Sequence, residues 1–310
     1  MHKPILVLSA LLTAGSAQAN CASAFCAMNT DWDVQGVWEK PGVRLDLRAE
    51  FIDLDQLRRG SSKTRPGGVE DTHDETRTIN RNFTGTLDWN ITPEWGLTLR
   101  APLVNRAHSH VHNDAGGPEK GSWSFTRMGD MQAVARYAFY QDANATAGVR
   151  FGLKLPTGGR SEKNDAGEKA ERSLQPGTGS TDGILGLYYN RRVGNFTWFG
   201  QASWQQVIHE HDHFRPGRQF GLDVGMNYML TPDWSLMLQA NAQHKSHDSG
   251  ANAEPDDSGA THLYLSPGIA YRATRDVQIY GFLQQPIHQH VRGTQLTADW
   301  AAALGVSMQF

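Results

Sequence analysis

The sequence predicts an all-β protein: a transmembrane antiparallel up-and-down β-barrel of about twelve strands around a polar lumen. Three observations predict it. Segments of about ten residues alternate apolar and polar side chains, short and long connections take turns between them, and the chain ends on an aromatic residue, Phe310. Beyond residue 19 no stretch approaches the roughly 20 consecutive apolar residues of a membrane-spanning helix. We therefore expect strands to cross the membrane.

The first nineteen residues have the pattern of a cleavable secretory signal. Lys3 supplies a positive start, residues 5–14 are apolar, and Ala17-Gln18-Ala19 supplies the small residues of a cleavage site. An exported barrel belongs in the outer membrane of a Gram-negative bacterium. We expect three parts: a signal peptide at 1–19, a periplasmic N-terminal segment at 20–42 and an outer-membrane barrel at 43–310.

Two cysteines, Cys21 and Cys26, lie in the N-terminal segment. Because the periplasm oxidises thiols, a short-loop disulfide between them is the main expectation. Metal binding or redox chemistry is the alternative, although two cysteines make an incomplete zinc site and their spacing does not match haem attachment.

Alternation places the strands in twelve ranges, an even number that leaves both chain ends on one side. In the last range Leu296 and Trp300 share the apolar face, which we expect to meet lipid, and Asp299 and Ser307 share the polar face. The twelve ranges are 43–57, 77–91, 96–110, 129–141, 146–157, 181–192, 196–211, 218–230, 234–247, 261–273, 277–290 and 296–310.

The connections between these ranges sort by length. Two nearly identical turns, Thr92-Pro93-Glu94-Trp95 and Thr231-Pro232-Asp233-Trp234, mark the periplasmic rim together with three other short turns. Six longer polar connections, such as 112–128 and 158–180, face outside. A soluble sandwich would have no reason to sort its loops by side. The aromatic residues near the short turns fit a membrane girdle; they are Trp89, Trp198, Tyr189, Tyr228 and Tyr271.

Charged side chains of both signs share the polar phase of the strands, so we expect them to line the lumen. They are Arg44, Asp46, Arg48, Glu50, Asp88, Arg100, Arg106, Arg136, Arg150, Lys154 and Asp223. Opposite charges inside a barrel can line a water-filled pore, or can pair across the lumen and close it. The sequence leaves both possibilities open.

Histidines gather in the outer connections and at the outer ends of strands. Alternation predicts that they point inward at the outer mouth, where side chains two residues apart could chelate zinc or copper. A barrel radius of about 12 Å is too large for one ion shared across a round barrel, which leaves several separate weak sites or one site closed by folded-in loops. The alternative is a hydrophilic rim that binds lipopolysaccharide phosphates when protonated. Three groups repeat a His-x-His pattern: His108, His110 and His112; His209, His211 and His213; His288 and His290.

The remaining expectations concern partners and activity. Phe310 on the lipid face resembles the C-terminal signal that barrel assembly machinery reads on its clients. Outer-membrane lipid, lipopolysaccharide and a small solute or ion are the other expected partners. A formal charge of -3 excludes a strongly basic nucleic-acid binder. The lipid-facing phase carries no convincing Ser and His pair, so we do not expect an enzyme.

Two glycine-rich motifs carry a resemblance to a known family. Leu155-Pro156-Thr157-Gly158 precedes a polar stretch, and Gln175-Pro176-Gly177-Thr178-Gly179-Ser180 with Asp182 follows it. This pair resembles the outer-membrane family named for the meta pathway of phenol degradation. The resemblance implies a transport-type barrel, and the family name suggests hydrophobic or aromatic substrates. We expect the motifs to set turn geometry where the chain leaves the sheet; ligand contact is the alternative.

Three functions remain open at this point. The leading hypothesis is an outer-membrane channel or facilitator for a small solute, with divalent metal ions captured at the histidine-rich rim. A non-transporting structural or binding barrel would instead dock a periplasmic partner through residues 20–42. A facilitator for aromatic or hydrophobic compounds is the third.

Overall fold

The computed structural model describes residues 17–18, 28, 30, 41–66, 72–114, 117–251 and 253–310. In that part of the chain twelve strands close into one antiparallel barrel, which confirms the predicted fold class. The barrel strands are β2 (Gly42–Arg59), β4 (Thr72–Asn90), β5 (Trp95–Asp114), β7 (Met131–Gln141), β8 (Ala145–Leu155), β9 (Ser180–Val193), β10 (Phe196–Glu210), β12 (Gln219–Met229), β13 (Trp234–Lys245), β15 (Ala260–Arg272), β16 (Val277–Val291) and β17 (Thr294–Gln309). The described residues form no helix long and apolar enough to cross a membrane.

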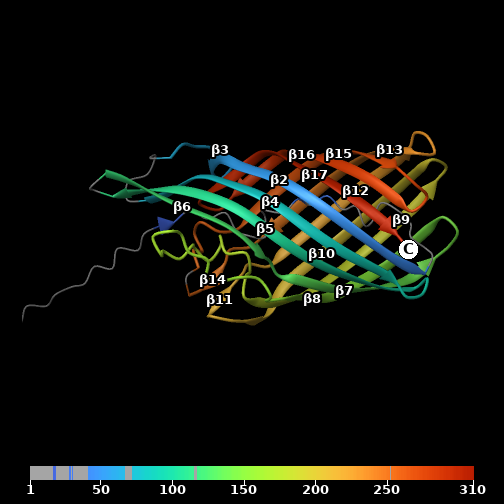
Figure 1. Cartoon of the computed structure of the whole chain (residues 1–310), viewed down its shortest axis with the longest axis horizontal. Helices are drawn as coiled ribbons and strands as arrows, with labels where there is room; N and C mark the ends of the chain where they lie inside the picture. Colours follow the sequence, from blue (N-terminus) through green and yellow to red (C-terminus); the bar gives the residue numbers. More distant parts are fainter. Residues whose placement is uncertain are drawn as a thin grey trace, which may run out of the picture.

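Each barrel strand pairs with the next barrel strand along the chain, and the last pairs with the first (Figure 1). The seam between β2 and β17 ends on two backbone hydrogen bonds. Phe310 N donates to the carbonyl of Val43 (2.8 Å), and Val43 N donates to the carbonyl of Phe310 (3.3 Å). The residue predicted to mark the end of the barrel therefore completes its closing ladder.

Short turns gather at one end of the barrel, which we call the short-turn rim; the opposite end is the long-loop rim. A threonine organises two of these turns in the same way. Its hydroxyl accepts a hydrogen bond from the backbone N–H three residues on, at Thr92 (3.0 Å) and Thr231 (3.1 Å). Thr274 repeats the arrangement in a third turn (3.1 Å). These side chains hold the backbone in a tight turn, as the sequence predicts.

The outer surface of the barrel is apolar because every second side chain of each strand points outward. Leu187, Val224 and Leu304 are more than half exposed there. Aromatic pairs border this band at the short-turn rim: the ring centroids of Trp95 and Tyr137 lie 4.7 Å apart, and Trp234 and Tyr271 repeat that distance. A surface this apolar requires lipid rather than water around it.

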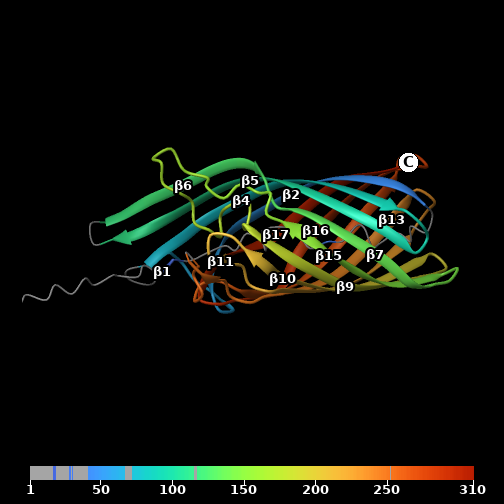
Figure 2. The ribbon, with the colours of Figure 1, turned by 90° about the horizontal axis from the view of Figure 1, so that it is seen from below.

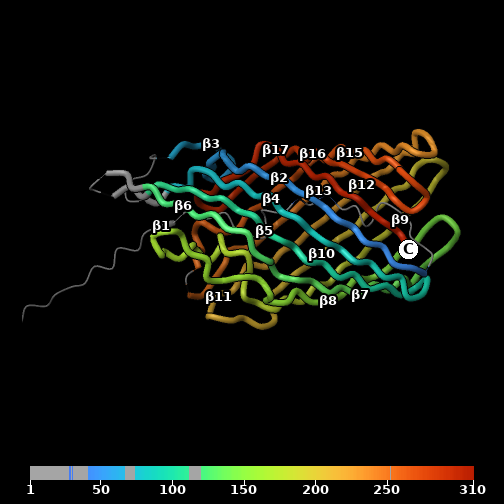
Figure 3. The backbone as a smooth tube through the Cα atoms, viewed as in Figure 1, coloured from blue at the N-terminus to red at the C-terminus, as the bar shows by residue number. Residues whose placement is uncertain are grey.

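One strand lies where the sequence predicts a loop. Most of the connection 112–128 is β6 (Gly117–Met128), which pairs with the outer half of β5, while β7 pairs with the inner half. The β5–β6 hairpin extends beyond the other strands at the long-loop rim (Figures 2 and 3). Four two-residue strands lie at the same end: β1 (Ala17–Gln18), β3 (Ser62–Lys63), β11 (Phe214–Arg215) and β14 (Ser249–Gly250).

Irregular pairing near the long-loop rim changes which side chains of β17 face inward. The register with β2 shifts around Ala298, and Leu296, predicted to meet lipid, is 4% exposed inside the barrel. Asp299, predicted to face the lumen, lies on the outer surface, where its carboxylate pairs with Lys63 (3.0 Å). Both predictions are wrong because a strict period of two fails where a bulge changes the register.

The same correction applies to β16. Leu263 pairs with His288 and Tyr264 pairs with Pro286, so Ile287 is an extra residue. The faces of the strand exchange at this bulge. His288 and His290 are exposed, and the prediction that they point inward is wrong.

Candidate functional site

The lumen face of the strands carries the charged residues predicted from alternation. Seven of the eleven are buried: Arg44, Asp46, Glu50, Asp88, Arg106, Lys154 and Asp223. Four are partly buried: Arg48, Arg100, Arg136 and Arg150. Burial of a charge is costly unless hydrogen bonds or opposite charges compensate it, so the partners of these groups define the site.

Near the short-turn rim the charges pair with their neighbours. The guanidinium of Arg44 contacts the carboxylate of Asp88 at 2.5 Å, and Thr98 Oγ1 donates to the other oxygen of that carboxylate (2.5 Å). Arg136 donates to the amide oxygen of Asn90. This part of the lumen therefore carries a network of paired charges and hydrogen bonds.

Above this network the lumen contains a cavity of about 340 Å³. Arg100 and Arg150 line it together with Asp46 and Asp223. Its size lies at the lower end of the range that binds small molecules in proteins. The cavity is the part of the described lumen most suited to hold a solute.

Among the described residues of the N-terminal segment, Met28 and Thr30 lie inside the barrel. Arg48 donates hydrogen bonds to the carbonyl (2.5 Å) and hydroxyl (2.6 Å) of Thr30. Met28 packs in an apolar cluster with Leu54, Tyr280 and other inward residues of β2 and β15–β17. Both residues border the cavity and narrow it. The cysteines and most of residues 20–42 lie outside the described residues, so the disulfide and the docking role stay predictions.

A buried lysine between two carboxylates joins the strands to the connection after β8. Lys154 Nζ lies 3.1 Å from Asp130 and 3.2 Å from Asp182, and all three side chains are almost inaccessible. Asp130 also accepts hydrogen bonds from the backbone of Gly158 (3.0 Å) and Thr178 (2.8 Å). We call Asp130, Lys154, Thr178 and Asp182 the clasp. It ties both glycine-rich motifs to the barrel wall.

The two motifs also touch each other directly. A Cβ built on Gly177 would lie 2.6 Å from the carbonyl carbon of Gly158, so only glycine fits. Beyond this contact the connection reaches the lumen face of β5, where Arg106 donates to the carbonyl of Leu174 (2.7 Å). Leu174 is fully buried with Trp123 of β6. The connection 156–179 is thus a packed element over part of the long-loop rim.

Asp130 is the residue of this site that the sequence analysis missed. It lies inside the predicted strand range 129–141, but the observed strand β7 begins one residue later, at Met131. The backbone N–H groups of the two glycine-rich motifs lie outside the strand ladders and need a hydrogen-bond acceptor. This need was the one signal in the sequence that pointed to a residue such as Asp130. Tyr188 and Gln201 were also missed, although their phase along β9 and β10 places them on the lumen face.

The histidine groups do not form one site. His108 and His110 are buried: His108 Nδ1 shares a hydrogen bond with Thr78 (2.8 Å), and the ring of His110 is tilted against that of Trp123 with centroids 4.6 Å apart. His209 and His211 are more accessible, with ring centroids 4.8 Å apart. Among the described side chains, which exclude His112, no three His, Cys, Asp or Glu residues are placed to hold a metal. Zinc or copper capture stays a prediction.

Acidic side chains from three elements converge at the long-loop rim. The pKa of Glu254 is raised to about 9. Burial is the main cause, and the neighbouring carboxyl groups of Glu75, Asp257 and Asp248 add to it. Burial and the charge of Glu254 likewise raise the pKa of Glu171 in the connection after β8. Two long connections therefore meet through carboxyl groups that prefer to be neutral.

Raising the pH is expected to weaken this contact. The folded protein holds the proton on Glu254 more tightly than the unfolded chain does. Protonated Glu254 therefore contributes its full share to the free energy of unfolding below the ordinary pKa of 4.5. It decreases as the pH rises toward about 9. Thermal unfolding midpoints across this pH range should fall more steeply for the wild type than for Glu254→Gln. The exposed Glu168→Gln serves as control, and equal slopes for Glu254→Gln and wild type would contradict the expectation.

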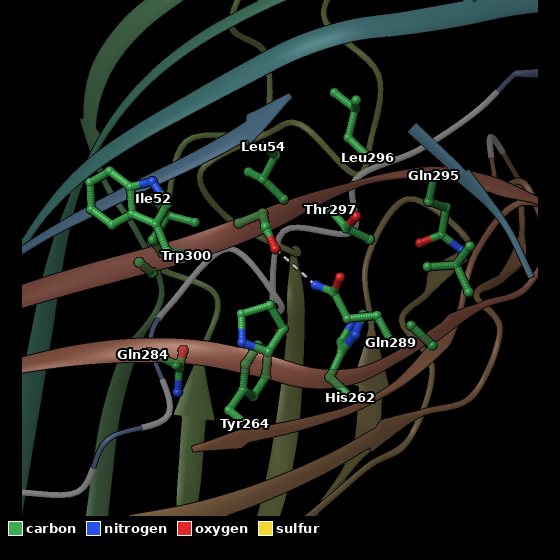
Figure 4. A pocket seen from close by; sticks show the side chains of 15 residues that line it. Ile52, Leu54, His262, Tyr264, Gln284, Gln289, Gln295, Leu296, Thr297 and Trp300 are labelled. Carbon is green, nitrogen blue, oxygen red and sulfur yellow. Dashed lines mark hydrogen bonds between the residues drawn. The ribbon is translucent and has the colours of Figure 1, made fainter. Parts of the chain in front are cut away.

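The barrel wall itself has a discontinuity between β16 and β17. Their ladder ends at Gln284 and Ala301, and beyond it side chains bridge the strands: Gln289 Nε2 donates to the carbonyl of Ala298 (3.0 Å). Figure 4 shows this bridge beside a small pocket lined by Leu54 and Trp300. Arg58 extends across the same place to Gln289 (3.0 Å).

Solved structures similar to this chain are outer-membrane proteins. An outer membrane channel from Pseudomonas putida F1 has a TM-score of 0.64 at 14% sequence identity, covering 91% of this chain and 100% of that one. A NanC porin has a TM-score of 0.46 at 10% identity, with 86% and 100% covered. A Pseudomonas aeruginosa FadL homologue has a TM-score of 0.41 at 11% identity, with 88% and 90% covered. The first likeness supports the barrel fold.

Sequence comparison gives the family. No curated protein matches the sequence. The family described as the MetA-pathway of phenol degradation matches residues 83–300, well over half of the chain and including both glycine-rich motifs. The resemblance noted from those motifs is thereby confirmed, and the chain belongs to this family.

Proposed function

We propose that the protein is a passive channel for small solutes in the outer membrane of a Gram-negative bacterium. The observation that carries the proposal is the closed barrel with an apolar outer surface and a cavity of about 340 Å³ in a polar lumen. A barrel of this kind gives a solute a water-lined route where the surrounding lipid does not. The similar outer membrane channel from Pseudomonas putida supports the same function.

The route is expected to pass through the cavity, and a thiol placed there tests it. Ser203 lines the cavity and tolerates a cysteine of similar size. In a Cys21→Ser/Cys26→Ser background, a bulky thiol reagent should lower the conductance of Ser203→Cys in planar bilayers by about half or more, because it fills the pore. Leu222→Cys on the exposed outer face is the control and should not respond. A current that the reagent leaves unchanged in Ser203→Cys would contradict this route.

A facilitator for aromatic or hydrophobic compounds is the second candidate. The discontinuity between β16 and β17 favours it, because apolar Ile52, Leu54 and Leu296 lie directly behind it. A larger hollow of about 480 Å³ shares Pro286 and Gln289 with this pocket, but apart from Pro286 and Ile287 its lining is polar or charged. Under this candidate the folded protein conducts little current even before the reagent is added. The same recording therefore separates the two functions.

A further inference from the structure

The charged side chains around the lumen cavity balance each other, and the protein itself supplies their partners. The described lining contains three arginines and three carboxylates, each with a partner in the protein: Arg48, Arg100, Arg150, Asp46, Glu50 and Asp223. Glu50, for example, pairs with Arg48 (3.0 Å), and Asp46 accepts the hydroxyl of Tyr280 (2.9 Å). These charges therefore give neither an anion nor a cation a clear advantage in the cavity.

Uncharged polar side chains form one wall of the same cavity. Ser203 of β10, Gln219 of β12 and Gln243 of β13 all line it. Within the described ranges of the chain, these three side chains make no hydrogen bond to the rest of the protein. A carboxamide both donates and accepts hydrogen bonds, as does a hydroxyl group. The hydrogen-bonding capacity of this wall is therefore available to water or to a solute.

The strand registers place these side chains around a glycine. Gly221 of β12 lies directly opposite Ser203 on one side and opposite Gln243 on the other. Gln219 precedes Gly221 on the same face of β12 and lies opposite Gln205. At ordinary strand spacing this surface measures about 10 by 7 Å, close to the dimensions of a monosaccharide. We call Ser203, Gln219, Gly221 and Gln243 the amide wall.

The centre of the amide wall is open because Gly221 has no side chain. A Cβ built at this position would have one neighbouring heavy atom within 4 Å among the described residues, the hydroxyl oxygen of Ser203 at 2.7 Å. A solute can therefore approach the backbone of β12 there, with Gln219 and Gln243 beside it. The wall is a shallow, uncharged surface bordered by groups that both donate and accept hydrogen bonds.

We propose that the amide wall binds a small neutral solute rich in hydroxyl groups, such as a monosaccharide or another polyol, as it passes through the lumen. This inference rests on the proposed channel function and names the class of solute. Neighbouring hydroxyl groups both donate and accept hydrogen bonds, so they complement carboxamides. A neutral solute also brings no charge that would lack a partner among groups already satisfied by the protein. Bonds between neutral groups are individually weak, which lets the solute leave again.

The experiment records the current of the full barrel in planar bilayers in KCl while glucose is added. Glucose should reduce the current beyond the fall in bulk conductivity and in a saturable way, because a molecule held at the wall obstructs the cavity. Dioxane, a neutral ring without hydroxyl donors, should have a much weaker effect at equal concentration.

Substitution of the two glutamines tests the wall itself. In Gln219→Leu/Gln243→Leu the half-blocking concentration of glucose should rise about three- to tenfold, because leucine keeps the volume but loses the hydrogen bonds. Gln141→Leu, at an exposed position on the short-turn rim, is the control and should keep the wild-type value.

The outcomes separate this inference from the proposed function. Absence of any current from the folded barrel overturns the channel itself. A current that glucose lowers no further than the bulk conductivity, or an equal block in the double variant and the wild type, overturns the amide wall alone. If the double variant does not fold, Gly221→Ala decides. Its methyl group meets the hydroxyl of Ser203, which can rotate aside, but it fills the centre of the wall. A raised half-blocking concentration in Gly221→Ala supports the inference, and an unchanged one overturns it.

Discussion

Replacing Lys154 by methionine is expected to lower the free energy of unfolding by about 3–5 kcal/mol. The change leaves the carboxylates of Asp130 and Asp182 buried next to each other without the cation that lies about 3 Å from both. Removing one partner of a buried ion pair is more harmful than replacing the whole pair, because the remaining charge is uncompensated. The measurement is urea unfolding in detergent followed by tryptophan fluorescence.

Two comparison variants make this prediction specific. Lys163→Met removes an exposed lysine from the same connection and should leave the unfolding curve unchanged. Lys154→Met/Asp182→Asn should recover part of the loss, since it removes one of the uncompensated charges while keeping the shape. If Lys154→Met unfolds like Lys163→Met, the clasp does not stabilise the barrel.

Substituting Gly177 by alanine is expected to detach the connection 156–179 from the long-loop rim. The new Cβ would lie 2.6 Å from backbone atoms of Gly158, which cannot move aside as the end of a side chain can. Overpacking of this kind costs about 1–3 kcal/mol. Trypsin cleavage after Arg172, which is 8% exposed, should then become about ten- to a hundredfold faster because it follows the population of the open form.

The control for Gly177→Ala is Gly200→Ala in β10. The nearest heavy atom to a Cβ at Gly200 is 3.9 Å away, so the extra methyl group meets no steric conflict. Cleavage after Arg172 should match the wild type in this control. Equal rates in Gly177→Ala and Gly200→Ala would show that the contact between the two glycine-rich motifs does not hold the connection in place.

The barrel strands could be predicted from sequence because a strand between lipid and a polar lumen must alternate apolar and polar side chains. Lipid outside and a polar lumen inside force alternation, so Arg44, Asp46 and Arg48 share one face and Leu45 and Leu47 the other. Near the long-loop rim this constraint weakens. The phase of Leu296 and His288 then depends on bulges, which sequence alternation does not reveal.

The hairpin strand β6 and the clasp were harder to predict from the sequence for a related reason. In β6 the alternation is clear only around Trp123 and Phe125, which is shorter than the ten residues expected of a membrane strand. Asp130 acts through backbone groups of Gly158 and Thr178, which are distant in sequence and meet only after the chain has folded. The sequence motifs therefore identify the donor segments, but they do not identify Asp130 as the carboxylate that accepts their hydrogen bonds.

The seam between β2 and β17 has a consequence for the order of assembly. Val43 lies in the first barrel strand and Phe310 directly follows the twelfth, yet the two bond to each other. Until β17 arrives, β2 keeps an open edge that can pair with the wrong strand or with another chain. The barrel therefore cannot mature strand by strand as the chain emerges. Its closure is a long-range step, because the two strands of the seam lie at opposite ends of the barrel sequence, and this makes folding slow and vulnerable to aggregation in water.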